Sequence, residues 1–203
     1  MIPALEASGH AVYAPQLSAQ DRAETTLSDH AAEVAALIEE QDLNEVLLVG
    51  HSYGGMVITA AAERVPERLA RLVYLDAWVP FDGESAFMCR PEIERAFTPD
   101  ARGGVTPPID PWFVGVETEE QAEIVRRELI GLSLRCWQEP VRLESPQAAA
   151  LPRSFVFARH SAMGAMAERA LEAGYDYHEL ETEHMAPLAD PVGTAGVLMA
   201  IAG

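Results

Sequence analysis

The feature that most constrains the fold is the decapeptide Val46–Gly55, Val-Leu-Leu-Val-Gly-His-Ser-Tyr-Gly-Gly. An apolar run, a turn of the pattern G-x-S-x-G and an alanine-rich segment follow one another, which predicts a strand, a tight turn and a helix. Gly50 and Gly54 have no side chain and would let the chain fold back closely at this corner. The corner would raise the Ser52 hydroxyl above the sheet, at a helix N-terminus that favours developing negative charge. Ser52 is therefore the predicted nucleophile, and the alternative is a structural turn serine.

Apolar periodicity predicts strands and helices that alternate along most of the chain. The predicted strands are His10–Pro15, Glu45–Val49, Leu69–Leu75, Arg153–Ala158 and Tyr175–Leu180, and the predicted helices are Met1–Ser8, Leu27–Gln41, Gly55–Val65, Ala162–Ala173 and Pro191–Ala202. This alternation predicts an α/β fold with a doubly wound, mostly parallel sheet. In such sheets the functional site lies beyond the carboxyl ends of the strands.

The alternation is interrupted between residues 79 and 151, where proline and glycine are frequent. Within this stretch Thr118–Leu132 is the one long helical segment, and we expect the rest to be loop and helix rather than more sheet. The sequence therefore predicts a helical cap, residues 79–151, inserted into a core made of residues 1–78 and 152–203.

The composition limits the binding partners that we expect for this protein. The 203 residues suit one domain, and the net charge of −18, with arginine as the only basic residue apart from histidine, makes nucleic acid and membrane surfaces poor partners. Cys89 and Cys136 lack metal-binding spacing, so we expect two free thiols and no metal or other cofactor. The N-terminus lacks the features of a signal peptide, which favours a cytoplasmic location. The sequence leaves open whether the protein forms a homodimer.

A serine nucleophile needs a histidine base. His184 lies in the loop after the last predicted strand, where the chain order Ser…Asp/Glu…His places the base, and it is the predicted base. His160, just after a strand, is the open alternative. The other four histidines are less suitable as the base because of their positions. His10 begins a strand, His30 lies in a helix and His178 lies within a strand. His51 cannot easily turn its ring onto the neighbouring serine.

The acid that orients the base is predicted to be Asp76, which ends the strand Leu69–Leu75 at the same edge of the sheet. Its alternative role is to hydrogen-bond a turn. Glu183 and Asp190 are too close to the base in sequence, and Asp176 should lie in a strand. One oxyanion donor would be the backbone N–H of Tyr53, which follows the nucleophile.

With these residues placed, the chain resembles the α/β-hydrolases, in the branch that contains plant methyl-salicylate-type esterases, hydroxynitrile lyases and bacterial relatives. The matching segments are Gly50–Val57, Leu72–Pro80, Trp112–Val116 and the loop that carries His184. Three features depart from this branch. No carboxylate follows the penultimate strand, Glu183 stands where glycine is usual, and the first strand with its second oxyanion donor is absent. By typical element lengths, about 20–30 residues would be missing.

The resemblance implies hydrolysis of small carboxylic esters through an acyl-enzyme on Ser52. His51 and four aromatic residues of the cap would line the substrate pocket, and the alternative for the aromatic residues is that they simply pack the cap: Phe87, Trp112, Phe113 and Trp137. Hydroxynitrile lyases of the branch use a cap lysine, and this chain has none. The alternative functions are a non-catalytic ligand-binding or inactive protein, and lyase or perhydrolase chemistry at the same three residues.

Overall fold

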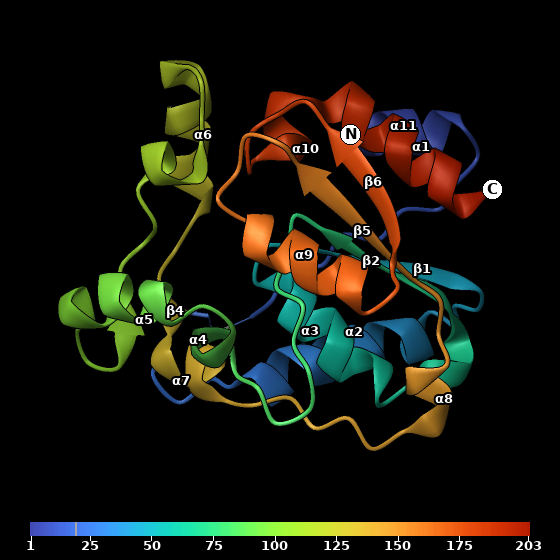
Figure 1. Ribbon diagram of the computed structural model, residues 1–203, viewed down its shortest axis with the longest axis horizontal. Helices are drawn as coiled ribbons and strands as arrows, with labels where there is room; N and C mark the ends of the chain where they lie inside the picture. Colours follow the sequence, from blue (N-terminus) through green and yellow to red (C-terminus); the bar gives the residue numbers. More distant parts are fainter. Residues whose placement is uncertain (19) are drawn as a thin grey trace.

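A computed structural model describes residues 1–18 and 20–203, and its centre is a four-stranded parallel sheet (Figure 1). The strands, in their spatial order, are β1 (Val46–His51), β2 (Leu69–Leu75), β5 (Arg153–Ala158) and β6 (Asp176–Leu180). Their apolar runs suit a parallel sheet that is covered on both faces. The α/β architecture with a mostly parallel sheet is thus confirmed.

Helices cover both faces of the sheet. On one face the core packs α2 (Leu27–Glu40), α3 (Gly54–Ala62) and α9 (Gly164–Glu172) against side chains such as Leu72 and Tyr74. On the other face α1 (Ile2–Ala7) and α11 (Pro191–Ala202) meet the alternate side chains Val73 and Leu75. This alternation along β2 is the period of two expected of a strand with two buried faces. The chain therefore folds as a three-layer α/β/α core.

The segment predicted as a cap lies beside the sheet and carries only short elements, several of which project away from the core in Figure 1. They are α4 (Ala86–Cys89), α5 (Pro91–Phe97), η2 (Thr98–Asp100), β3 (Val105–Thr106), η3 (Pro111–Val114), α6 (Glu119–Glu128), β4 (Leu132–Ser133), α7 (Leu134–Gln138) and α8 (Pro146–Ala149). The expectation of no further sheet was wrong in one detail, because β3 and β4 form a small antiparallel ribbon.

The ends of two helices are explained by the residues that flank them. Thr26 caps α2 in a capping box with Asp29, while Gly9 follows α1 with φ of +91°.

Two predictions about secondary structure were wrong. The loop before α11 contains a short helix, α10 (Ala186–Ala189), and His10–Pro15 has no strand hydrogen bonds. A strand needs a partner for its backbone groups. Within the described residues β1 pairs only with β2, and a hollow separates it from the His10–Pro15 segment.

Candidate active site

Ser52 stands at the corner between β1 and α3, in a left-handed backbone conformation with φ of 54°. Such a conformation is unfavourable for a residue with a side chain and needs support from its surroundings. The support comes from β2 and the residues after it. The Ser52 N–H donates to the carbonyl of Leu75 (3.4 Å), and its own carbonyl accepts from the N–H of Trp78 (3.1 Å).

Two glycines make this corner possible by their close approaches. A Cβ on Gly50 would lie less than 3 Å from the carbonyl of Gly54, and a Cβ on Gly55 would lie less than 3 Å from the carbonyl of Trp78. A Cβ on Gly54 would meet no atom within 4 Å. The expected steric need for Gly54 is therefore wrong, and Gly55 is the second glycine that the packing requires.

Asp76 ends β2 in a second left-handed corner, with φ of 44°, and its side chain is fully buried. Its Oδ1 accepts hydrogen bonds from the backbone N–H of Ala158 (3.1 Å) and the hydroxyl of Ser161 (3.0 Å). These two donors compensate for the water that the carboxylate has lost. They also leave Oδ2 free to face the loop of His184.

His184 joins the two corners. Its Nδ1 lies 2.6 Å from Oδ2 of Asp76, and its Nε2 lies 3.0 Å from Oγ of Ser52. Because a carboxylate only accepts hydrogen bonds, Nδ1 carries the proton of the neutral ring and Nε2 is free to accept the serine proton. Only 13% of the His184 side chain is exposed. This arrangement can activate a hydroxyl for attack on an electrophilic carbon.

The alternative residues lie elsewhere. His160 is exposed and lies 3.4 Å from Glu181, on the surface of the turn after β5. Asp190 caps α11 by accepting from the N–H of Gly193 (2.8 Å), and Asp176 pairs with Arg71 at the start of β6. The structure thus brings together Ser52, His184 and Asp76, whereas His160, Asp190 and Asp176 have other partners.

Ser161 was not singled out from the sequence. It follows β5 by three residues, where the sequence analysis looked for a carboxylate and found none. Its hydroxyl also accepts from the N–H of Met163 (3.1 Å), which fixes its direction toward Asp76. A serine in a turn gives no distinctive sequence signal, so only the fold could reveal this contact.

The cap contacts the loop that carries His184 on both sides of that residue. Gly115, at φ of +73°, leaves no room for a Cβ because the side chain of Glu183 lies within 3 Å of that position. Met185 and Leu188 pack against a small apolar cluster of the cap that contains Val114, Val116, Ala122 and Val125. The position of the base therefore depends on the cap as well as on the core.

The aromatic residues expected to line the pocket fall into two groups. Phe87 and Trp137 are buried and stack with ring centroids 5.7 Å apart, and Trp137 also lies 5.5 Å from the ring of Tyr53. Trp112 and Phe113 are 51% and 60% exposed. The buried pair packs the cap against the nucleophile corner, whereas the exposed pair lies on the surface of the cap.

Tyr53 is the N-cap residue of α3, so the first backbone N–H groups of that helix begin beside Ser52. Its hydroxyl lies 3.2 Å from Nδ1 of His30 on α2. Burial lowers the pKa of His30. The neutral His30 ring therefore helps to hold Tyr53 at the corner where an oxyanion donor is expected.

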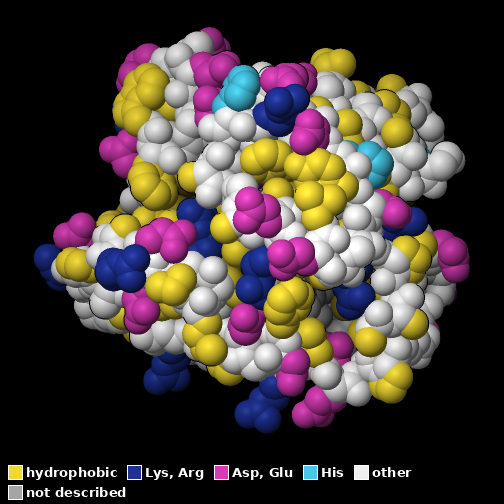
Figure 2. All heavy atoms as spheres, in the orientation of Figure 1, with side chains coloured by type: hydrophobic (Ala, Val, Ile, Leu, Met, Phe, Trp, Pro, Cys, Tyr) yellow, Lys and Arg dark blue, Asp and Glu magenta, His cyan; other side chains and the backbone are white. Residues whose placement is uncertain are grey.

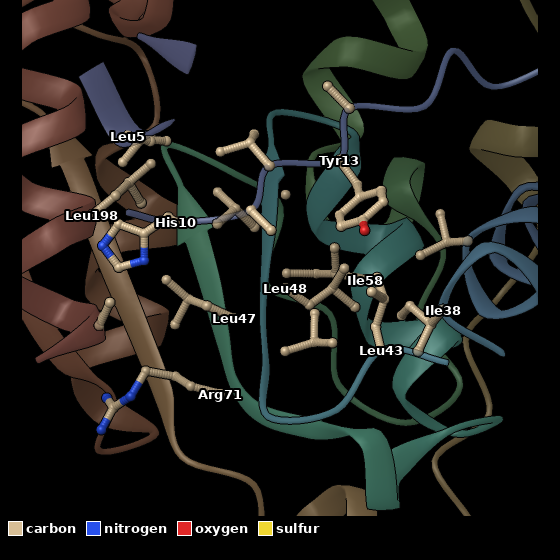
Figure 3. A pocket seen from close by; sticks show the side chains of 18 of the residues that line it. Leu5, His10, Tyr13, Ile38, Leu43, Leu47, Leu48, Ile58, Arg71 and Leu198 are labelled. Atoms are coloured by element: carbon tan, nitrogen blue, oxygen red, sulfur yellow. The ribbon is translucent and has the colours of Figure 1, made fainter. Parts of the chain in front are cut away.

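One hollow of the molecule is not lined by any of these three residues. It has a volume of about 920 Å³ and follows the free edge of β1, with Leu47 and Leu48 on its opposite sides (Figure 3). Helix residues such as Leu5 and Leu198 form one wall, and Ile38 and Ile58 the other. Ser52, Asp76 and His184 are not among its lining residues. The three residues therefore do not open into this hollow.

The charged surface agrees with the composition. Acidic side chains are scattered over the face seen in Figure 2, and no broad basic patch gathers there. Within residues 1–18 and 20–203, no three His, Cys, Asp or Glu side chains are grouped to hold a metal ion. In the same residues, every helix is too short or too polar to cross a membrane.

Comparisons with known proteins identify the family to which the chain is similar. Residues 2–197 match a family described as the alpha/beta hydrolase family. The chain is 32% identical over 173 residues to the carbendazim hydrolyzing esterase of a Nocardioides species, covering 76% of this chain and 71% of that protein. It is also 38% identical over 85 residues to salicylic acid-binding protein 2 of tobacco, covering 38% of this chain and 33% of that protein.

A solved structure of an extracellular alpha/beta-hydrolase from a Paenibacillus species superposes with a TM-score of 0.86. That comparison covers 99% of this chain and 90% of the other, at 25% identity. Polyneuridine aldehyde esterase has a TM-score of 0.80 at 20% identity, with 99% of this chain and 91% of the other covered. The second likeness concerns the fold alone.

Proposed function

Because the chain belongs to the alpha/beta hydrolase family, we propose that it is a carboxylic-ester hydrolase that works through an acyl-enzyme on Ser52. The observation that carries the proposal is the continuous path from the Ser52 hydroxyl through His184 to the buried Asp76. Each link is within hydrogen-bond distance, as nucleophilic catalysis by serine requires.

In the first half of the proposed reaction, Oγ of Ser52 attacks the ester carbonyl carbon while its proton moves to Nε2 of His184. The carbonyl π electrons move to oxygen, where the N–H of Tyr53 at the start of α3 stabilises the negative charge. The buried carboxylate of Asp76 stabilises the imidazolium that forms. Collapse of this intermediate breaks the ester C–O bond, and the leaving alkoxide takes the proton from Nε2.

In the second half, water attacks the acyl carbon and gives its proton to Nε2 of His184. The new intermediate breaks the bond to Oγ, which takes that proton back, and the carboxylic acid leaves. The two halves together consume one ester and one water and restore Ser52. No other reactant is needed.

Small-molecule ester substrates fit the similarity to proteins that are named as esterases or lipases. The relatives include the carbendazim hydrolyzing esterase, Lipase LipV of Mycobacterium tuberculosis and methylesterase 1 of Arabidopsis thaliana. The cap packs its buried aromatic pair, Phe87 and Trp137, against the ring of Tyr53, so apolar side chains lie beside the residue that follows Ser52. We therefore propose small, largely apolar esters as substrates.

The test combines turnover with covalent labelling. The purified chain should hydrolyse p-nitrophenyl acetate, and a fluorophosphonate should label it at Ser52 in a one-to-one ratio. Carbendazim and simple methyl esters complete the substrate panel. Ser52→Ala should abolish both signals, whereas Ser8→Ala, which changes an exposed serine after α1, should keep them. A folded chain that neither turns over any ester nor reacts with the fluorophosphonate would instead be a non-catalytic member of the family.

A further inference from the structure

His51, the last residue of β1, contacts the backbone of the proposed base rather than the nucleophile beside it. Its Nε2 lies 2.8 Å from the backbone carbonyl oxygen of His184, across 133 residues of sequence. The two imidazole rings lie side by side, with centroids 4.7 Å apart and planes inclined by 36°. A strand of the core thus reaches directly into the loop that carries the base.

The direction of this hydrogen bond follows from its partners. A carbonyl oxygen can only accept, so Nε2 of His51 carries the proton and donates it. Burial, and next the neighbouring His184, lower the pKa of His51 to about 3. His51 therefore stays neutral when His184 accepts a proton, and it adds no repulsive positive charge beside the imidazolium.

The loop needs such a contact because Glu181–Met185 contains no helix or strand. The ring of His184 must reach two atoms at once, Oδ2 of Asp76 at 2.6 Å and Oγ of Ser52 at 3.0 Å. A shift of its peptide would disturb both hydrogen bonds together. Displacements of about 1 Å in a catalytic group can cost about 10²-fold in rate.

We propose that His51 is a positioning residue, whose neutral Nε2–H holds the His184 peptide so that its ring serves Ser52 and Asp76 together. This proposal rests on the proposed function for its kinetic consequence. The hydrogen bond itself exists in the resting protein and can be tested without turnover. The role also differs from the substrate-lining role expected from the sequence, since the Nε2 of His51 is already engaged by the protein.

The kinetic test compares two variants of different hydrogen-bonding capacity. His51→Leu removes the donor and keeps much of the volume, and we expect kcat for p-nitrophenyl acetate to fall about 10- to 100-fold while KM changes less than about twofold. His51→Gln keeps an N–H donor and should recover most of this loss. The rate of labelling by a fluorophosphonate should follow kcat, because it reports the nucleophilicity of Ser52.

Three results would overturn the proposal: a folded His51→Leu protein with the wild-type kcat, a loss confined to KM, or a His51→Gln protein as slow as His51→Leu. If His51→Leu does not fold, NMR of the ¹⁵N-histidine-labelled wild type decides. It should show His51 neutral and protonated on Nε2 at pH 7, and the Nδ1 tautomer would refute the role. A wild type without any esterase activity would refute the proposed function and leave this NMR test in force.

Discussion

The two corners that carry Ser52 and Asp76 share a left-handed backbone conformation but differ in the contacts that support it. Both follow neighbouring parallel strands, and both place a residue with a side chain at positive φ, 54° and 44°. At the first corner the support comes from backbone hydrogen bonds of Ser52 and from close approaches of the backbone that Gly50 and Gly55 allow, and we call it the steric corner. At the second the support is polar, since a buried carboxylate is held by donors from the end of β5 and the turn that follows.

The two corners also depend on each other. The N–H of Trp78, two residues after Asp76, holds the carbonyl of Ser52, and Gly55 leaves room for the carbonyl of that same Trp78. The strain at the nucleophile is therefore supported in part by the chain that leaves the acid. Strained residues persist only where their surroundings over-determine them, and here each corner forms part of the other's surroundings.

The largest effect is expected when only the chemistry of the Asp76 side chain is changed. Asp76→Asn keeps the size of the side chain, but its amide can donate to His184 and favour the wrong tautomer of the ring. We expect kcat for p-nitrophenyl acetate to fall by about 10³- to 10⁴-fold. Thermal unfolding should stay cooperative. A folded Asp76→Asn protein with a near-wild-type rate would show that Asp76 is a structural turn residue.

The steric corner can be tested with two adjacent glycines. Gly55→Ala would force its Cβ into the carbonyl of Trp78, and we expect a loss of about 3 kcal/mol in unfolding free energy or failure to fold. Gly54→Ala meets open space at the first turn of α3, and its unfolding free energy should change by less than about 0.5 kcal/mol. Urea unfolding of both variants measures the difference, and equal stabilities would mean that the close approach at Gly55 is not required.

The same contrast explains what the sequence could and could not predict. The steric corner leaves a recognisable pattern, because close approaches demand glycine at fixed spacing, and Ser52 was predicted from it. One glycine was nevertheless misjudged, since the pattern does not show which of Gly54 and Gly55 meets the neighbouring backbone. At the second, polar corner Asp76 was predicted from its place at the end of a strand, but its donors leave no pattern, because they come from residues more than eighty positions away.

Long-range contacts account for the remaining differences. His10–Pro15 has the composition of a strand, but β-propensity is realised only where a partner strand is present. His51 was set aside as a base because it cannot easily turn onto Ser52. Its hydrogen bond to His184 depends on how a loop 133 residues away returns to the sheet, which periodicity does not report. Most of the core elements were predictable, whereas the contacts that tune the site were not.

The smallest expected effect concerns the turn after β5. Ser161→Ala removes one of the two donors to Oδ1 of Asp76 and leaves the N–H of Ala158 in place, so we expect kcat to fall about tenfold. His160→Ala alters the adjacent, exposed residue and should keep the wild-type rate, which would also remove His160 as a rival base. Steady-state kinetics on p-nitrophenyl acetate can resolve the pair. If the Ser161 and His160 variants are equally active, the backbone N–H of Ala158 alone orients Asp76. Both corners would then be held by the backbone: the corner of Asp76 by the end of a strand, and the corner of Ser52 by close approaches at its glycines.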